Sequence, residues 1–172
     1  FKMPYHGHVA VAHNGNLTNA LSLRKKLESS GSIFTTTSDS EVFIHLLARS
    51  KKKRLRERLS EVVRIVKGAY SLVLIARDRI YGLRDAHGFR PLVLGKKDSS
   101  YIMASESCAL DLVGASLIRE IEPGEVVRVD KDEVMSFYPK NKLQQRSFCS
   151  FEPIYFSRPD SLLSKKTIYE YR

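Results

Sequence analysis

Apolar residues recur at helical spacing along the first part of the chain. Gly7 to His13 comes first and reads as a short buried strand. Three stretches follow in which apolar positions lie three or four residues apart, the spacing of a helix face packed on a core. They predict a helix capped by Asn16 or Thr18 and running to about Ser30, a helix after Ser38, and a helix over roughly Lys53 to Lys67. The residues expected to face the core are Leu17, Ala20, Leu23, Leu27, Val42, Phe43, Leu46, Leu47, Leu55, Leu59, Val62 or Val63, and Val66.

Two of these helices carry boundary signals. Gly31 follows the first helix and is a typical helix stop. Ser38 and Glu41 have the S-x-x-E spacing of a capping box at the start of the second. Asp39 then falls in the first turn, where a carboxylate complements the positive end of the helix dipole.

From Gly68 the pattern changes to short alternating strands separated by turn residues. A short helix, Glu106 to Val113, interrupts them. Helices followed by antiparallel strands predict an α+β fold, with the helices laid on a large sheet. The last segment, 139–172, has no periodicity and reads as a connecting arm. The predicted strand segments are AYSLVLIA, IYGLR, DAHGFRPLVLG, YIMAS, SLIREI, GEVVRVD and EVMSFY.

Composition limits the classes of protein to which the chain can belong. A chain of 172 residues, 42% of them apolar, suggests one domain with a sizeable core, and a tail. Its apolar runs are too short to span a bilayer, and no signal-peptide pattern is visible. Cys108 and Cys149 form no disulfide framework, which favours a reduced, cytoplasmic protein. The chain starts at Phe1, so we expect a fragment or a processed product.

The formal charge of +10 is concentrated between Arg49 and Arg58. One interpretation is a patch that binds anions or nucleic acid. The other is the solvated face of the third helix, because Leu55 and Leu59 recur at helical spacing beside the charges. No aromatic residues alternate with the cations to stack on bases, which favours the solvated face.

The candidate chemistry is sparse. Cys108 lies in a short apolar helix and is expected in the core. No Cys or His spacing predicts a zinc site, and no phosphate-binding glycine loop is present. Asn14-Gly15 is an ordinary turn dipeptide, or an Asn amide and a Gly N–H that converge on one oxygen as an oxyanion hole. Asp39 is a helix cap, or a carboxylate that holds a substrate ammonium.

The order of several motifs adds a resemblance. AHNGNLTNALSLRKKLESSGSIFTTTSDSEVFIHLLARS resembles the glutamine amidotransferase domain of the N-terminal-nucleophile class. The later segments narrow the resemblance to the amidophosphoribosyltransferase family, which opens purine synthesis, and it runs essentially from end to end. Those segments are GAYSLVLIARDRIYGLRDAHGFRPLVLG, ASESCALDLVGA, REIEPGEVV and FEPIYFSRPDS.

The resemblance implies a fold and a set of roles. The fold is a four-layer αββα sandwich of the N-terminal-nucleophile hydrolase type, incomplete at its N-terminus. Asn14 and Gly15 match the oxyanion hole, and Asp39 matches the residue that grips the α-amino group of glutamine. The run Thr36-Thr37-Ser38 lines the same pocket, and Gly88-Phe89-Arg90-Pro91 is an architectural turn.

The implied enzyme transfers ammonia from glutamine to phosphoribosyl pyrophosphate and forms 5-phosphoribosylamine. Residues 1–138 correspond to part of the amidotransferase domain, and 139–172 to an arm toward a phosphoribosyltransferase domain. That domain would use Mg²⁺. We expect a homodimer or homotetramer, with no nucleic-acid or membrane partner, in the cytoplasm or, after removal of a transit peptide, in a plastid. Some members use a cysteine at the position of Cys149 as a [4Fe–4S] ligand, although one cysteine cannot define a cluster and a structural thiol is favoured.

The family's nucleophile is an N-terminal cysteine whose own amine is the base. By the resemblance, Phe1 falls after that cysteine and after an arginine that binds the glutamine carboxylate. We therefore expect the chain alone to be inactive. The alternatives are a fragment of another class II amidotransferase (glucosamine-6-phosphate synthase type), a non-catalytic basic binding module that uses Arg49–Arg58, and a glutaminase-like relic that acts as a structural or regulatory subunit.

Overall fold

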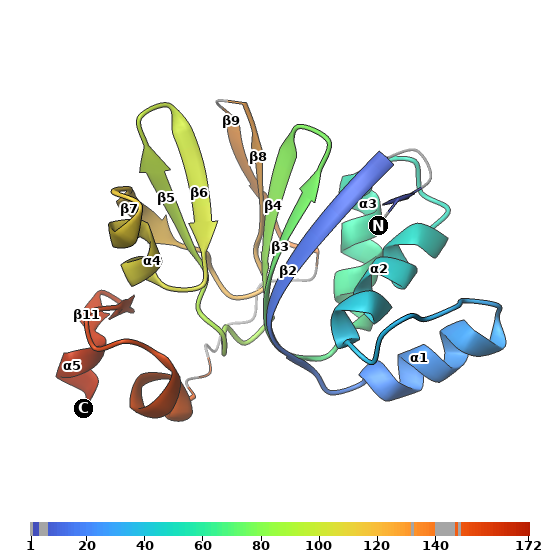
Figure 1. The fold of residues 1–172 in the computed structure, drawn as a ribbon, viewed down its shortest axis with the longest axis horizontal. Coiled ribbons are helices and arrows are strands. Elements are labelled where there is room, and N and C mark those ends of the chain that lie inside the picture. The colour runs from blue at the N-terminus through green and yellow to red at the C-terminus, as the bar shows by residue number, and fades with distance from the viewer. Residues whose placement is uncertain (1, 4–6, 132, 140–146, 148) are drawn as a thin grey trace.

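The computed structural model describes residues 2–3, 7–131, 133–139, 147 and 149–172 and contains two stacked antiparallel sheets (Figure 1). The larger sheet has the order β1-β2-β3-β4-β8-β9, and the smaller has the order β6-β5-β7. The strands of the larger sheet are β1 (Lys2–Met3), β2 (Gly7–Leu17), β3 (Gly68–Ala76), β4 (Arg79–Arg84), β8 (Val126–Asp130) and β9 (Glu133–Phe137). The smaller sheet contains β5 (Val93–Lys97), β6 (Ser100–Ala104) and β7 (Ser116–Glu120).

Helices cover the outer face of each sheet. The larger sheet carries α1 (Ala20–Ser29), α2 (Asp39–Arg49) and α3 (Leu55–Ile65) (Figure 1). The smaller sheet carries α4 (Ser107–Leu112), whose Leu110 packs with Val93 and Ala115. Leu92, Ile121 and Val127 pack between the two sheets. The four layers confirm the αββα prediction.

The helices lie on a large six-stranded sheet, as the strand pattern predicts, but three of the predicted strands form a second sheet, which that pattern does not predict. Strand β4 pairs directly with β8, with Leu83 opposite Val126. The segment between these two strands therefore folds on itself as β5, β6, α4 and β7. Period-two alternation marks each strand but carries no information about its partner.

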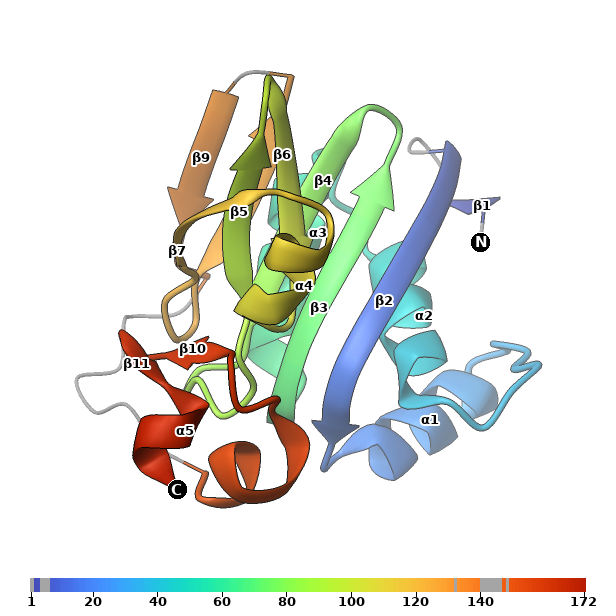
Figure 2. The same cartoon turned by 60° about the vertical axis from the view of Figure 1, so that its left-hand side comes forward.

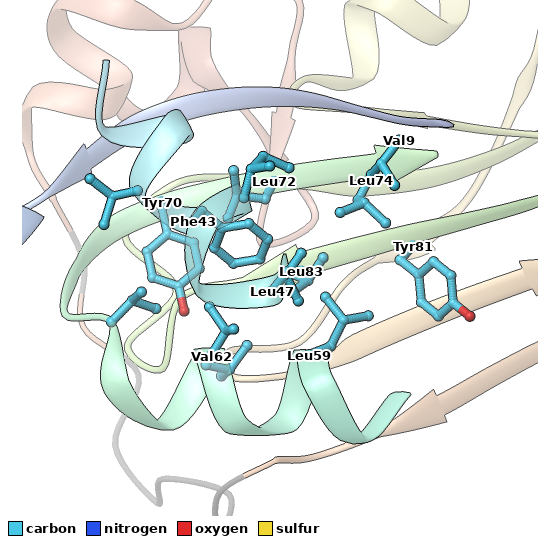
Figure 3. Close-up of a cluster of buried hydrophobic side chains, with 14 of the residues drawn as sticks. Val9, Phe43, Leu47, Leu59, Val62, Tyr70, Leu72, Leu74, Tyr81 and Leu83 are labelled. Carbon is cyan, nitrogen blue, oxygen red and sulfur yellow. The ribbon is translucent and has the colours of Figure 1, made fainter. Parts of the chain in front are cut away.

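The predicted helical stripes form the main core. It lies between the three helices and the larger sheet, and Figure 3 shows ten of its side chains labelled. Phe43, Leu47 and Leu59 are fully buried there. Ala20 and Leu46 are partly buried against the same cluster, and the remaining predicted positions are buried: Leu17, Leu23, Leu27, Val42, Leu55, Val62, Val63 and Val66.

Two boundary predictions near the start are wrong. Strand β2 does not stop at His13 but continues to Leu17, and it pairs with β3 from Val9–Ala76 to Leu17–Gly68. It is also not buried throughout, because Ala10 and Ala12 are exposed. Cross-strand pairing over this length outweighs the local turn preference of Asn-Gly.

The first helix begins at Ala20, so neither Asn16 nor Thr18 caps it. The N–H of Thr18 donates instead to the carbonyl of Lys67. Asn19 occupies the cap position without a side-chain cap bond, and its amide bonds the C-terminal end of α3 through Ile65 and Lys67.

One member of the basic run is structural. Arg58 is 1% exposed, and its guanidinium donates to the carbonyls of Leu47 (2.9 Å) and Lys52 (2.6 Å). It thereby satisfies acceptors at and just beyond the end of α2, which a helix leaves unpaired. The cations Lys51, Lys52, Lys53, Arg54 and Arg56 are exposed, as a solvated face requires.

The C-terminal segment packs beside the smaller sheet (Figure 2). It contains the π-helical turn η1 (Glu152–Phe156), the hairpin β10 (Leu162–Leu163) and β11 (Lys166–Thr167), and α5 (Ile168–Tyr171). Arg90 pairs with the buried Glu152 at 2.8 Å, and the hydroxyl of Ser107 accepts from the N–H of Leu162. Residues 140–146 and 148 of the predicted arm lie outside the described residues, and its connecting role stays a prediction. None of the helices in the described ranges has the length and apolar character that a membrane crossing requires.

Candidate functional site

The candidate residues gather along one edge of the larger sheet. Strand β1 pairs with β2 only at Gly7 and His8. Beyond His8, no other strand of the described residues covers that edge of β2 (Figure 2). Asn14 and Gly15 lie on this open edge, so a substrate can approach them from the side as well as from either face.

Two cavities flank the edge. On the helix side, a cavity of about 380 Å³ is lined by Gly15 and Asn16, by α1, and by Thr37, Ser38 and Asp39. On the side of the smaller sheet, a cavity of about 350 Å³ is lined by Asn14 together with residues of β3 and β6. Neither Cys108 nor Cys149 lines either cavity.

Asn14 is free to donate. Its carboxamide has no hydrogen-bond partner among the described residues, and it faces the second cavity. Alternation along β2 puts Asn14 and Gly15 on opposite faces, while a strand's N–H groups lie in the plane of the sheet. Asn14 therefore lines the cavity on the side of the smaller sheet, and Gly15 lines the cavity on the helix side, at the same edge of the sheet.

The backbone conformation and close surroundings of position 15 require a glycine. Its φ is +133°, and a Cβ at this position would lie 2.1 Å from the carbonyl oxygen of Ala69. The two strands approach so closely that any side chain would push β2 away from β3. The turn interpretation of Asn14-Gly15 is therefore wrong, because this glycine belongs to a strand.

Asp39 is held at the mouth of the first cavity by two contacts. The N–H of Leu17 donates to its Oδ2 at 2.8 Å, and His13 Nδ1 lies 3.1 Å from its Oδ1. The Asp39 side chain is 19% exposed. The cavity thus presents a fixed carboxylate, and Asp39 is at the same time the first residue of α2, as predicted.

His13 was not predicted as a site residue. Its side chain is 5% exposed, Nδ1 also lies 3.2 Å from Ser40 Oγ, and its Nε2 is buried with no partner among the described residues. The available signal was its position one residue before Asn14, which places it on the helix side of the strand with Gly15 and Leu17.

Glu41 shapes the loop that leads into α2, and the capping box is therefore only half correct. Ser38 is the N-cap, but its hydroxyl accepts from the N–H of Ser40. The Glu41 carboxylate instead accepts four hydrogen bonds, from the N–H and hydroxyl groups of Thr35 and Thr36. Thr36 is engaged here, so Thr37 and Ser38 line the cavity and Thr36 does not.

Those bonds determine the charge state of Glu41. Its burial acts to raise the pKa, but the hydrogen bonds from Thr35 and Thr36 outweigh burial and lower the pKa to about 2. Arg24 holds the same loop from the other side. It donates to the carbonyl of Thr36 at 2.6 Å and lies over the ring of Phe34.

We expect Glu41→Gln to destabilise the fold by about 2 kcal/mol at pH 7, because one accepting oxygen becomes an NH2 donor facing a threonine N–H and the other becomes a neutral acceptor. The folded pKa is below the usual 4.5, so the unfolded chain binds more protons between these values. The contribution is complete above about pH 4.5 and is lost as the pH falls toward 2. Urea midpoints of wild type and variant should converge over that range.

The matched control is Glu57→Gln, which changes an exposed glutamate in the first turn of α3. It should shift the urea midpoint little at any pH. A constant difference between Glu41→Gln and wild type from pH 7 to pH 3 would contradict the assignment.

Other predicted residues have structural surroundings. Cys108 is buried in α4, as expected. Asp85 accepts from the N–H groups of His87, Gly88 and Arg90, which forms the predicted turn before β5. Cys149 is partly buried, and the described residues contain no group of three or more His, Cys, Asp or Glu side chains able to hold a metal ion.

Comparison with known proteins identifies a family for the chain. A sequence profile described as a glutamine amidotransferase domain matches residues 3–112. The chain is 46% identical over 167 residues to amidophosphoribosyltransferase 1, chloroplastic, of Arabidopsis thaliana, covering 96% of the chain and 29% of that protein. It is 41% identical over 172 residues to the amidophosphoribosyltransferase of Bacillus subtilis, covering 100% of the chain and 36% of that protein.

A solved structure has the same fold. The glutamine phosphoribosylpyrophosphate amidotransferase from B. subtilis, complexed with ADP and GMP, superimposes with a TM-score of 0.93 at 40% identity. The match covers 98% of the chain and 37% of that structure. The chain thus spans about a third of the length of these relatives.

Proposed function

The chain belongs to the glutamine amidotransferase domain family, and from this membership we propose that it forms the glutamine site of an amidophosphoribosyltransferase. Such an enzyme releases ammonia from the amide of glutamine and passes it to phosphoribosyl pyrophosphate, giving 5-phosphoribosylamine. The observation that carries the proposal is the open edge of β2, where the free amide of Asn14 and the backbone of Gly15 lie between two cavities and beside Asp39. The chain matches amidophosphoribosyltransferases over nearly its whole length. This match supports an amidophosphoribosyltransferase over an enzyme of the glucosamine-6-phosphate synthase type.

Asp39 is proposed to bind the α-ammonium group of glutamine. Its carboxylate already accepts from Leu17 and faces His13, and these contacts fix its orientation before the substrate arrives. A charge-assisted bond to a preoriented carboxylate gives both affinity and selection for an α-amino acid.

Asn14 and Gly15 are proposed to stabilise the oxyanion that forms when a nucleophile attacks the amide carbon of glutamine. The carboxamide of Asn14 and the N–H of Gly15 would donate to it. In the family the nucleophile is a cysteine thiolate, which attacks the carbonyl carbon, and the C–N bond then breaks as the nitrogen takes up a proton and leaves as ammonia. Cys108 is buried in α4 and Cys149 precedes η1, and we assign this role to neither.

The remaining assignments follow the same proposal. Residues 1–138 would form the amidotransferase part and 139–172 the connection to a phosphoribosyltransferase part, which would hold the phosphoribosyl pyrophosphate and Mg²⁺. The assembly would be a homo-oligomer. A [4Fe–4S] cluster needs four ligands, and Cys149 has no grouping of metal ligands around it in the described ranges.

The test compares two nitrogen sources in a protein that joins this chain to the nucleophile cysteine and to a phosphoribosyltransferase part, with and without Asp39→Asn. Asparagine keeps an oxygen to accept from Leu17 but removes the charge. We expect the KM for glutamine to rise about tenfold or more, while ammonia-dependent pyrophosphate release from phosphoribosyl pyrophosphate stays unchanged. No glutamine-dependent release in the wild-type protein would reject the function, whereas a normal KM in the variant would reject only the role of Asp39.

A further inference from the structure

A basic groove lies at the other end of the larger sheet. It is lined by residues from three separate segments: the start of α3, the β3–β4 turn, and β8. Its volume is about 510 Å³. Six of its lining residues are cations: Lys53, Arg54, Arg56, Arg77, Arg79 and Arg128. We propose that this groove binds a small anion that carries two or more adjacent phosphate groups.

Among the described residues, cations outnumber acids at the groove. Arg79 pairs with Asp130 at 2.8 Å, and Arg128 lies 3.2 Å from Glu133. Asp78 is the acidic residue among the lining side chains. The lining cations Lys53, Arg54 and Arg56 are exposed and form no ion pair with another described residue. In addition, Nε of Arg128 is buried without an acceptor among the described residues.

The backbone at the start of α3 adds to the positive electrostatic potential of the groove. The first turn of α3 lines the groove, and its N-cap residue, Arg54, makes no side-chain cap bond. The N–H groups at a helix start carry partial positive charge and favour phosphate. Convergent cations from three segments around a hollow, together with this helix start, suit a compact multivalent anion better than a single carboxylate.

The shape of the groove favours a small ligand over nucleic acid. Its volume is in the range of small-molecule sites. Its aromatic residue, Tyr81, is 2% exposed and offers no face for base stacking.

This groove is separate from the candidate glutamine site. Gly15 pairs with Tyr70, whereas the β3–β4 turn follows Ala76, which pairs with Val9. Six residues along a strand correspond to about 20 Å. The inference therefore does not depend on the proposed function, and a variant here can leave glutamine chemistry intact.

The test is isothermal titration of the protein with tripolyphosphate, without divalent cations, at about 50 mM and about 200 mM salt. We expect saturable binding that weakens with salt, and weaker binding of orthophosphate. The double variant Lys53→Glu, Arg54→Glu changes two exposed side chains at the groove and should weaken tripolyphosphate binding at least about tenfold. Glutamine-dependent turnover should not change.

The control is Lys25→Glu, Lys96→Glu, which alters net charge equally at two exposed positions away from the groove. It should change the affinity less than about twofold, because distant exposed charges are screened. Equal weakening in both double variants, or no saturable binding of tripolyphosphate, would overturn the proposal. Tighter binding of a thymidine dodecamer, lost in the groove variant, would overturn it in favour of a nucleic-acid surface.

Discussion

Replacing Asn14 by alanine is expected to lower glutamine-dependent turnover about 100- to 1000-fold, the usual loss when one oxyanion-hole donor is removed. The Asn14 amide has no partner among the described residues and faces a cavity of about 350 Å³. In the proposed function, its N–H donors would bind charge that develops only during the reaction. The loss should appear in kcat more than in KM, because the ground-state amide gains less from this bond than the oxyanion does.

Two comparisons make this result specific. Asn14→Asp has nearly the same shape but lacks the N–H donors, so it should lose as much glutamine-dependent activity as Asn14→Ala. Ammonia-dependent activity should stay within about twofold of wild type in both variants, since ammonia bypasses the amide cleavage. A parallel fall of the two activities, or a kcat loss below about fivefold, would show that Asn14 is not an oxyanion donor.

The helices and the strand segments could be predicted because burial imposes a period on the sequence. Phe43, Leu47, Leu59 and Val62 face one core and recur at three- or four-residue spacing. The assignment of strands to two sheets could not be predicted in this way. Val93 and Val126 both lie in short apolar strands, yet they belong to different sheets, and only pairing between distant segments distinguishes them.

The sequence singles out Asn14, Gly15 and Asp39 as candidates, but it does not predict the geometry in which the structure places them. Asn14-Gly15 has a strong local turn signal, and what overrides it is β3, which lies more than fifty residues later in the chain. Glu41 shows the same limit. Its spacing from Ser38 predicted a capping box, but Thr35 and Thr36 offer four donors and hold its carboxylate instead. Buried polar groups choose partners by three-dimensional proximity, which short-range spacing does not encode.

The basic run shows that charge composition alone does not predict the role of each residue. The run Arg49 to Arg58 looks uniform in the sequence but serves two purposes in the fold. Arg58 is buried and bonds carbonyls at and beyond the end of α2, whereas Lys53, Arg54 and Arg56 line a groove with arginines from the β3–β4 turn and β8. A purely solvated face does not explain why these cations converge. The local sequence does not predict the convergence, because the segments are far apart in the chain.

The second large effect is expected from Gly15→Ala. A Cβ would lie 2.1 Å from the backbone oxygen of Ala69 and 2.8 Å from Cα of Tyr70, at a φ of +133°. Neither neighbour is a flexible side chain, so β2 must move away from β3. We expect a loss of about 3 kcal/mol or more in the free energy of unfolding, measured by urea denaturation.

Gly7 provides the matched control in the same strand. Its φ is also positive, at +70°, but a Cβ there would meet no atom of the described residues within 4 Å. Gly7→Ala should therefore cost only the backbone strain, about 1 kcal/mol. Gly68→Ala should match Gly15→Ala, because its Cβ would lie 2.2 Å from the carbonyl oxygen of Asn16 across the same pair of strands. Equal urea midpoints for the Gly15 and Gly7 variants would contradict the close approach of β2 and β3.

If the Gly15 variant remains folded in the cold, the displaced N–H should abolish glutamine-dependent turnover and spare ammonia-dependent turnover, because the proposed oxyanion donor and the strand contact are the same backbone.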